Sequence, residues 1–135
     1  MDVFDWLSRL IKIDTTTRNS NLPLIDLVQE WFLKHRILVR ATRDPIQPKA
    51  NLLGTLSAKD GSIEGGLLLS GHTDVVPVDG QTWKTNPFEA VKIKDRIFGR
   101  GTCDMKGFLA IALALVPEFQ KLDLTTNANS WRFND

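Results

Sequence analysis

The sequence predicts an α/β protein built as a three-layer α/β/α sandwich. Segments with helical spacing alternate with short apolar runs along the chain, a pattern typical of layered α/β domains. One of these runs, residues 67–69, consists of three leucines and follows two glycines, which indicates a buried strand entered from a turn. We therefore expect this strand at the centre of the sheet, with helices packed on its faces.

The first part of the chain predicts two helices. Residues 2–13 carry apolar side chains close to helical spacing, and Asp2 is a suitable N-cap. A polar loop follows at residues 15–21. Pro23 then opens a second helix that runs to about His35, which is expected to be a surface or capping residue.

The remaining elements are predicted from composition and alternation. Residues 37–42 and 51–57 are β-branched and apolar, and we expect them to form two paired strands. Residues 88–98 alternate apolar and polar side chains around a turn, which predicts a hairpin. Residues 105–115 are rich in alanine and leucine and predict a helix.

Composition and charge argue against several kinds of partner. The 135 residues suit one domain, with 42% hydrophobic residues, 24% charged residues and a formal net charge of +1. A charge this small indicates neither nucleic acid nor an anionic membrane as a partner. Cys103 is the single cysteine, so the chain has no internal disulfide, and no signal peptide or membrane-spanning run is visible. The expected location is the cytoplasm.

Candidate functional residues follow the predicted central strand. His72 and Asp74 lie just past its end, and ligands collect beyond the carboxyl ends of strands in open parallel sheets. One residue of separation suits a metal ligand and its supporter, so Asp74 is predicted to accept the second N–H of His72. A loop that carries a helix N-cap explains the same pattern without a metal.

Asp104 strengthens the metal interpretation. It lies between Gly101 and Gly107 and directly before the alanine-rich helix, so a carboxylate is presented at a strand-to-helix junction. The glycines allow the backbone to approach a bound ion closely. A helix cap is the alternative for Asp104 taken alone. Together with His72, it favours a metal centre.

The neighbours of Asp104 are expected to be structural. Arg100 and Lys106 are predicted to pair with nearby carboxylates. Cys103 is a soft donor, but we predict a small buried residue rather than a ligand. No serine nucleophile with histidine and aspartate, phosphate-binding loop or paired-cysteine zinc site is recognisable, so the nucleophile is expected to be water.

These segments resemble the N-terminal catalytic region of the dinuclear zinc amidohydrolase and exopeptidase family. The resemblance covers about residues 3–124 and rests on residues 70–80, Trp83, Pro87-Phe88 and residues 99–108. It implies a zinc-exopeptidase-like catalytic domain in which His72 ligates one zinc, Asp104 bridges two zincs and the catalytic residue Asp74 orients His72. It also implies that cobalt can replace zinc, and that the peptide bond after Asp104 is cis.

The resemblance further implies hydrolysis of an amide bond in a small N-acyl amino acid. Residues 18–22 and 49–52 favour members of the family that remove acetyl from N-acetylornithine in arginine biosynthesis. A succinylated diaminopimelate is the nearest competing substrate, followed by those of related aminoacylases and peptidases. The first zinc and its water would make a protein nucleophile unnecessary.

The same resemblance implies residues that the chain lacks. In the family a Glu-Glu pair supplies the general base and a zinc ligand, and this pair would fall just beyond Asp135. The later ligands, the lid domain and most dimer contacts are also absent. Residues 125–135 depart from the apolar strand expected there, so we divide the chain into hydrolase residues 1–124 and a divergent tail 125–135. We expect a truncated or frame-shifted, inactive fragment. The alternative is a non-catalytic remnant or weak metal-binding module.

Overall fold

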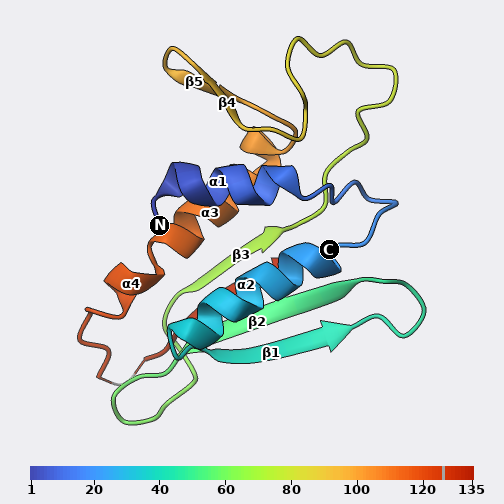
Figure 1. Ribbon diagram of the computed structural model, residues 1–135. Coiled ribbons are helices and arrows are strands. Elements are labelled where there is room, and N and C mark those ends of the chain that lie inside the picture. Colours follow the sequence, from blue (N-terminus) through green and yellow to red (C-terminus); the bar gives the residue numbers. More distant parts are fainter. Residues whose placement is uncertain (126) are drawn as a thin grey trace.

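A computed structural model describes residues 1–125 and 127–135. The described chain forms a four-stranded sheet with helices against it and a separate two-stranded hairpin beyond α1 (Figure 1). In chain order the elements are α1 (Val3–Lys12), α2 (Leu22–Lys34), β1 (Leu38–Arg43), β2 (Ala50–Leu56), β3 (Leu68–His72), β4 (Val91–Ile93), β5 (Arg96–Phe98), the π-helical turn η1 (Thr102–Lys106), α3 (Gly107–Ala114), α4 (Val116–Phe119) and β6 (Asn129–Asn134).

The sheet has the strand order β1-β2-β6-β3. β1 pairs antiparallel with β2, β2 pairs antiparallel with β6, and β6 pairs parallel with β3. In this register Leu69 of β3 and Gly54 of β2 both lie opposite Trp131 of β6. Because β3 and β6 run in the same direction, their carboxyl ends meet at one edge of the sheet, where His72 is paired with Asn134.

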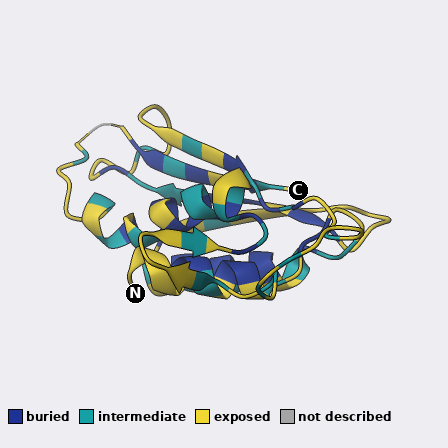
Figure 2. Cartoon of the chain, turned by 90° about the horizontal axis from the view of Figure 1, so that it is seen from above, coloured by how far each residue is buried: buried dark blue, intermediate teal, exposed yellow. Residues whose placement is uncertain are grey.

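Aromatic side chains join the helices to one face of the sheet. The ring of Phe32 on α2 lies 5.8 Å from that of Trp131 and 5.9 Å from that of Phe133, both on β6. Trp6 on α1 packs edge-on against Trp31 on α2 at 5.3 Å. Most of the buried hydrophobic residues belong to one cluster, and Figure 2 shows burial concentrated in the helices and sheet while the loops are largely exposed.

The α/β class is confirmed, but the predicted centre of the sheet is wrong. β3 is an edge strand, and Leu67 and Leu68 are 49% and 50% exposed. Alternation explains the exposure of Leu68, since Gly71 faces the helices whereas Leu68 and Ser70 point to the opposite face, and Leu67 lies just before the strand. Among the described residues the contacts of the helices are with one face, and the other presents Arg40, Leu53 and Arg132 around a shallow groove.

The strand between β2 and β3 comes from the segment expected to diverge. β6 lies within the predicted divergent tail, and in it Trp131 is fully buried and Phe133 is 1% exposed. Ser130 and Arg132 alternate with these aromatics and face away from the core. Because the two buried aromatic residues alternate with polar ones, the composition of the segment did not indicate a strand with one apolar face. The division of the chain at residue 124 stays a prediction.

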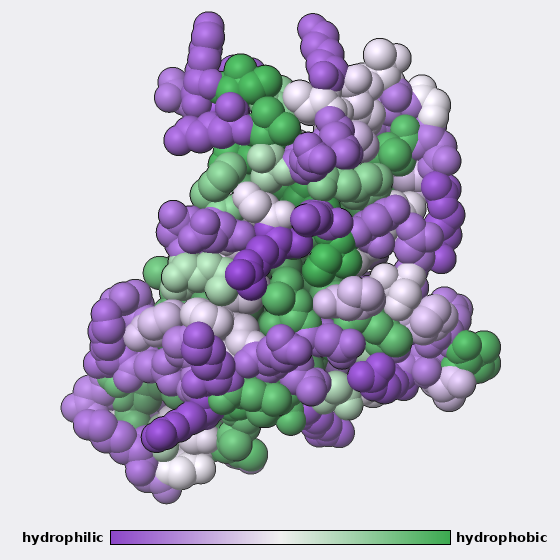
Figure 3. Space-filling view, viewed as in Figure 1, coloured by the Kyte–Doolittle hydropathy of each residue, from purple (hydrophilic) through white to green (hydrophobic). Residues whose placement is uncertain are grey.

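The other predicted elements agree with the structure. Asp2 and Asp5 form a capping box at the start of α1, and α2 begins with Pro23 in its first turn. β1 and β2 pair as expected, and β4 and β5 form the predicted hairpin. No helix in the described part of the chain is long and apolar enough to cross a membrane. The face seen in Figure 3 is mostly hydrophilic, with separate hydrophobic patches.

Candidate metal centre

The carboxyl end of β3 and the turn η1 enclose a cavity of about 310 Å³. β3 ends at His72, and the chain continues through Asp74 along one wall. The opposite wall is η1, which presents Asp104. The remaining lining comes from Val75, Val76, Trp83, Gly99, Arg100, Gly101, Thr102 and Cys103. The cavity therefore brings together all three residues that the sequence singled out.

The imidazole of His72 lies between two carboxylates. Its Nε2 is 2.9 Å from Oδ1 of Asp104, and its Nδ1 is 3.0 Å from Oδ1 of Asp74. The main-chain oxygen of Asp74 is also 3.1 Å from Nδ1. The predicted convergence of these side chains is confirmed, with Asp74 on the far nitrogen of His72. The side chain of Asp104 is 85% exposed and that of Asp74 28%, so Asp104 is the carboxylate open to the cavity.

The two carboxylates change the proton affinity of the ring. Partial burial lowers the pKa of His72, but the hydrogen bond to Asp104 and the contacts with Asp74 raise it, and the net direction is upward. A folded-state pKa above the usual value means that the imidazolium stabilises the folded chain at pH values below that of the unfolded histidine. This contribution disappears as the pH rises through the folded-state pKa.

The shape of η1 places Asp104 opposite His72. The turn begins at Gly101, which has a φ of 85°, a left-handed value that favours glycine. A Cβ on Gly101 would also lie 2.7 Å from Cγ1 of Val75. The peptide bond between Asp104 and Met105 is cis, as the family resemblance implied. The sequence prediction of a helix from residue 105 is thus accurate only from Gly107, where α3 starts.

Lys106 anchors η1 to the end of α1. Its side chain is fully buried, and Nζ donates to the carbonyl oxygens of Leu10 at 2.8 Å and Ile13 at 2.7 Å. The predicted partner, a carboxylate, is replaced by carbonyls at a helix C-terminus, which attract cations. Burial lowers the pKa of Lys106 to about 8, opposed by the charge of Asp14. The ammonium form is therefore the main form at neutral pH.

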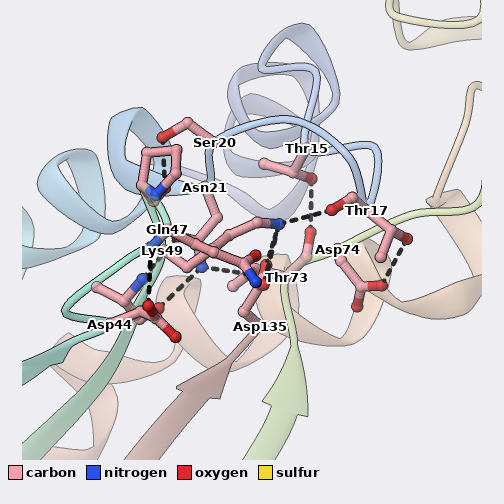
Figure 4. A network of polar contacts seen from close by, with 12 residues as sticks. Thr15, Thr17, Ser20, Asn21, Asp44, Gln47, Lys49, Thr73, Asp74 and Asp135 are labelled. Carbon is pink, nitrogen blue, oxygen red and sulfur yellow. Dashed lines mark hydrogen bonds and ion pairs between the residues drawn. The ribbon is translucent and has the colours of Figure 1, made fainter.

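A buried polar network supports the site from the N-terminal loop (Figure 4). Asn21 donates from Nδ2 to the Ala50 carbonyl at 2.8 Å and accepts from the Ala50 amide at 2.9 Å. Thr15 donates from its hydroxyl to the Thr73 carbonyl at 2.6 Å. All of these side chains are buried, and a satisfied buried network holds its members in one arrangement. The loop, β2 and the end of β3 are joined in this way.

A lysine joins the same network to the end of β6. Nζ of Lys49 donates to the Thr17 carbonyl at 3.0 Å and forms an ion pair with Asp135 at 2.9 Å. The Lys49 side chain is only 9% exposed, and the amide of Asp135 donates to Asn51 at 2.9 Å. The segments at 18–22 and 49–52, which carried part of the family resemblance, thus lie behind the site rather than in it.

Several residues around the cavity differ from their sequence interpretation. Cys103 was predicted to be buried, but it is exposed, because η1 turns its side chain outward beside Asp104. Arg100 stacks over the Trp83 ring at 5.1 Å and hydrogen-bonds to Gln81 instead of a carboxylate. Trp83 also lines the cavity. Sequence spacing does not predict the contacts of Arg100, because they join the loop that carries Gln81 and Trp83 to a residue that follows the hairpin.

The donor atoms fit a zinc-type ion incompletely. Zinc is bound in proteins by imidazole nitrogen and carboxylate oxygen, which His72 and Asp104 provide on one side of the cavity. Asp74 occupies Nδ1 of His72, as a carboxylate does in many zinc sites. In the described ranges, 1–125 and 127–135, no group of three or more His, Cys, Asp or Glu side chains is arranged to hold a metal.

Comparison with known sequences defines the class of protein. Residues 68–131 match the family model described as peptidase family M20/M25/M40. The matched segment contains β3, the residues that line the cavity and the first half of β6, so the similarity covers the elements that build the site. This part of the chain is therefore similar to a family of peptidases, one of which, the YXEP protein of Bacillus subtilis, is described as a dinuclear metal binding peptidase.

Within that class, the chain is similar to acetylornithine deacetylases of several bacteria. The enzyme of Pasteurella multocida (strain Pm70) is 41% identical over 118 residues, and the match covers 84% of this chain and 28% of that protein. The enzyme of Yersinia pestis is 38% identical over 115 residues, covering 83% of this chain and 29% of that protein. The chain spans less than a third of the length of these relatives.

Solved structures show the same fold at lower identity. Human carnosine dipeptidase 1 superposes with a TM-score of 0.77 at 17% identity, covering 98% of this chain and 33% of that one. An M20 family metallo-carboxypeptidase from Sulfolobus solfataricus gives 0.73 at 24% identity, covering 99% of this chain and 31% of that one. The fold of this chain is therefore shared with these two peptidases.

Proposed function

We propose that the chain carries part of the active site of a metal-dependent amide hydrolase that removes acetyl from N-acetylornithine. The observation that supports this most directly is the 2.9 Å contact between Nε2 of His72 and Asp104 at the carboxyl end of β3. The deacetylase relatives support the substrate class, a small N-acyl amino acid. A role in arginine biosynthesis and a cytoplasmic location belong to the same proposal.

His72 and Asp104 are the residues proposed to hold zinc. Asp104 has two oxygens at the open side of the cavity, which suits a carboxylate shared by two ions, and cobalt is expected to fit the same donors. Bound zinc would supply a Lewis acid for the scissile carbonyl and would make water more acidic. Asp74 is proposed to keep the His72 proton on Nδ1, so that Nε2 remains the donor.

The same geometry argues that the isolated chain is inactive. Catalytic zinc normally has three protein ligands, whereas His72 and Asp104 would have to serve two ions here. The residues that line the described cavity include no glutamate placed to accept a proton from water. Loss of a general base alone costs about 10² to 10⁴ in rate. We therefore propose weak zinc binding and no measurable turnover by the 135-residue chain itself.

This first prediction is tested by a chimera. Residues 3–124 of this chain replace the matched segment of the Pasteurella multocida deacetylase, and N-acetylornithine hydrolysis is measured with added zinc or cobalt. The chimera should be active, its His72→Ala form should lose activity, and its Arg40→Ala form on the distant sheet face should retain it. The isolated chain serves as the inactive comparison.

Two results would contradict the proposal. If the isolated chain shows metal-dependent turnover that disappears with His72→Ala, another residue completes the site and the inactive-fragment interpretation is wrong. If the active chimera prefers N-succinyl-diaminopimelate, the substrate assignment is wrong. The two-residue donor set supports one second candidate, a weak metal-binding module without catalysis, and this is the outcome if the chimera binds cobalt but hydrolyses neither substrate.

A further inference from the structure

Thr17 lies beside Asp74, close to the end of β3 (Figure 4). Its hydroxyl donates to Oδ2 of Asp74 at 3.0 Å, with the Val75 carbonyl as a longer second acceptor at 3.3 Å, while Oδ1 of the same carboxylate is 3.0 Å from Nδ1 of His72. Two different residues therefore engage the two oxygens of one carboxylate. A rotation of Asp74 that breaks one of these contacts also disturbs the other.

The backbone of Thr17 is fixed to the end of β3. Its amide donates to the Val75 carbonyl at 3.1 Å, and the amide of Val75 donates to the Thr15 carbonyl at 3.0 Å. From the other side, Nζ of Lys49 donates to the Thr17 carbonyl at 3.0 Å. These contacts hold the hydroxyl beside Asp74 even though the residue is exposed to solvent.

We propose that Thr17 is a positioning residue of this site, one that holds Asp74 so that the His72 proton stays on Nδ1 and Nε2 is the nitrogen left for a metal. This inference rests on the proposed metal site, which it deepens. An imidazole binds metal only through an unprotonated nitrogen, and the partner of the other nitrogen selects the tautomer. In the metal-free chain Asp104 can accept a hydrogen bond from Nε2, and the Asp74 carbonyl is also near Nδ1. Loss of the Thr17 hydroxyl should therefore shift the tautomer balance toward Nε2–H without abolishing the Nδ1–H form.

The second prediction concerns that balance in the metal-free 135-residue chain. Long-range ¹H–¹⁵N NMR of His72, recorded at a pH at which the ring is neutral, measures the Nδ1–H and Nε2–H populations. Thr17→Val removes the hydroxyl but keeps the side-chain shape, and it should raise the Nε2–H fraction relative to Nδ1–H by a factor of about 2 to 10, as expected for the loss of one hydrogen bond. Thr17→Ser should restore the wild-type ratio.

Thr42→Val, which makes the same atomic change on β1, is the matched control and should leave the ratio unchanged. Amide spectra report whether each variant keeps the fold, and Thr17→Ala replaces Thr17→Val if the latter does not. An unchanged ratio in a folded Thr17→Val or Thr17→Ala chain overturns the proposal. Cobalt titration tests the proposed metal site separately from the role of Thr17. If His72→Ala binds cobalt as well as wild type does, the assignment of the metal site is wrong. The tautomer ratio of His72 is measured without metal and does not depend on that result.

Discussion

At the scale of single residues, the site depends on a few side chains whose surroundings set their charge and direction. His72 is held between Asp74 and Asp104, and the pKa of its ring is raised as a result. Lys106 is held by carbonyls in the core, and burial lowers its pKa. The buried amine of Lys106 therefore fixes η1, and the partly exposed imidazole of His72 faces the cavity that η1 helps to form.

The third prediction concerns Lys106→Met. Methionine keeps much of the side-chain volume but leaves the carbonyls of Leu10 and Ile13 without their donor, which should cost about 1–3 kcal/mol of stability at pH 7. Because the folded-state pKa of about 8 is below that of a free lysine, the folded chain binds fewer protons than the unfolded chain above pH 8. Wild-type stability should therefore rise between about pH 8 and pH 10.

Urea unfolding at several pH values, followed by circular dichroism, measures both effects. The rise with pH should be absent from Lys106→Met, and the exposed Lys12→Met on α1 should behave like wild type. Equal pH dependence in wild type and Lys106→Met would show that this amine is not the group responsible.

At the scale of elements, close contact between β3 and the segment that carries Asp104 sets the width of the site. Gly71 lies on the helix-facing side of β3, and a Cβ there would be 2.7 Å from Cδ2 of Leu109 and 3.0 Å from Cε of Met105. A side chain at this position would have to displace the ends of the Leu109 and Met105 side chains for β3 to stay this close to η1 and α3. The neighbouring residue, His72, is within reach of Asp104 because of that approach.

The fourth prediction is that Gly71→Ala separates the two sides of the site. Overpacking of this kind typically costs about 1–3 kcal/mol, and the side chains most crowded belong to η1 and α3. Urea unfolding should show the loss of stability, and NMR should show that the His72 ring responds to the substitution. Ser70→Ala, one residue earlier and on the uncovered face, should change neither measurement. A Gly71→Ala chain as stable as wild type would argue against the close approach.

The sequence was sufficient to predict most elements and the two ends of the site. The apolar run before His72, the glycines around Asp104 and the helical spacing of residues 2–13 are local signals, and each predicted element formed. Such local signals could not predict the strand order of the sheet, since no residue near position 68 indicates which strand pairs with β3. Lys106 and Thr17 were missed for the same reason: their partners lie 96 and 57 residues away in the sequence.

At the scale of the whole molecule, β6 joins the two parts of the sheet. β2, which carries β1 on its other edge, pairs with one side of it and β3 pairs with the other, while its aromatic face meets α2 and α4. Trp131 is fully buried at this junction. Substitution of this one residue should therefore affect every layer of the molecule rather than one end of it.

The fifth prediction is that Trp131→Ala unfolds the whole chain. Truncation of a buried tryptophan costs about 3–5 kcal/mol, which is comparable to the total stability of a small domain. Circular dichroism and amide NMR should show loss of structure in all helices, whereas Arg132→Ala, on the exposed side of the same strand, should remain folded. Persistence of a folded β1–β2 and α2 unit in Trp131→Ala would show that the sheet has two independent parts.

The position of β6 also has a consequence for the time at which the site forms during synthesis. The residues proposed to bind metal are complete once Asp104 has been made, yet β3 reaches β2 only through a strand made about 25 to 30 residues later. At about 5 to 20 residues per second, the ribosome adds that stretch in roughly one to six seconds. During this interval β3 has no neighbouring strand in the sheet, and its exposed edge can pair with a wrong strand or bind a chaperone.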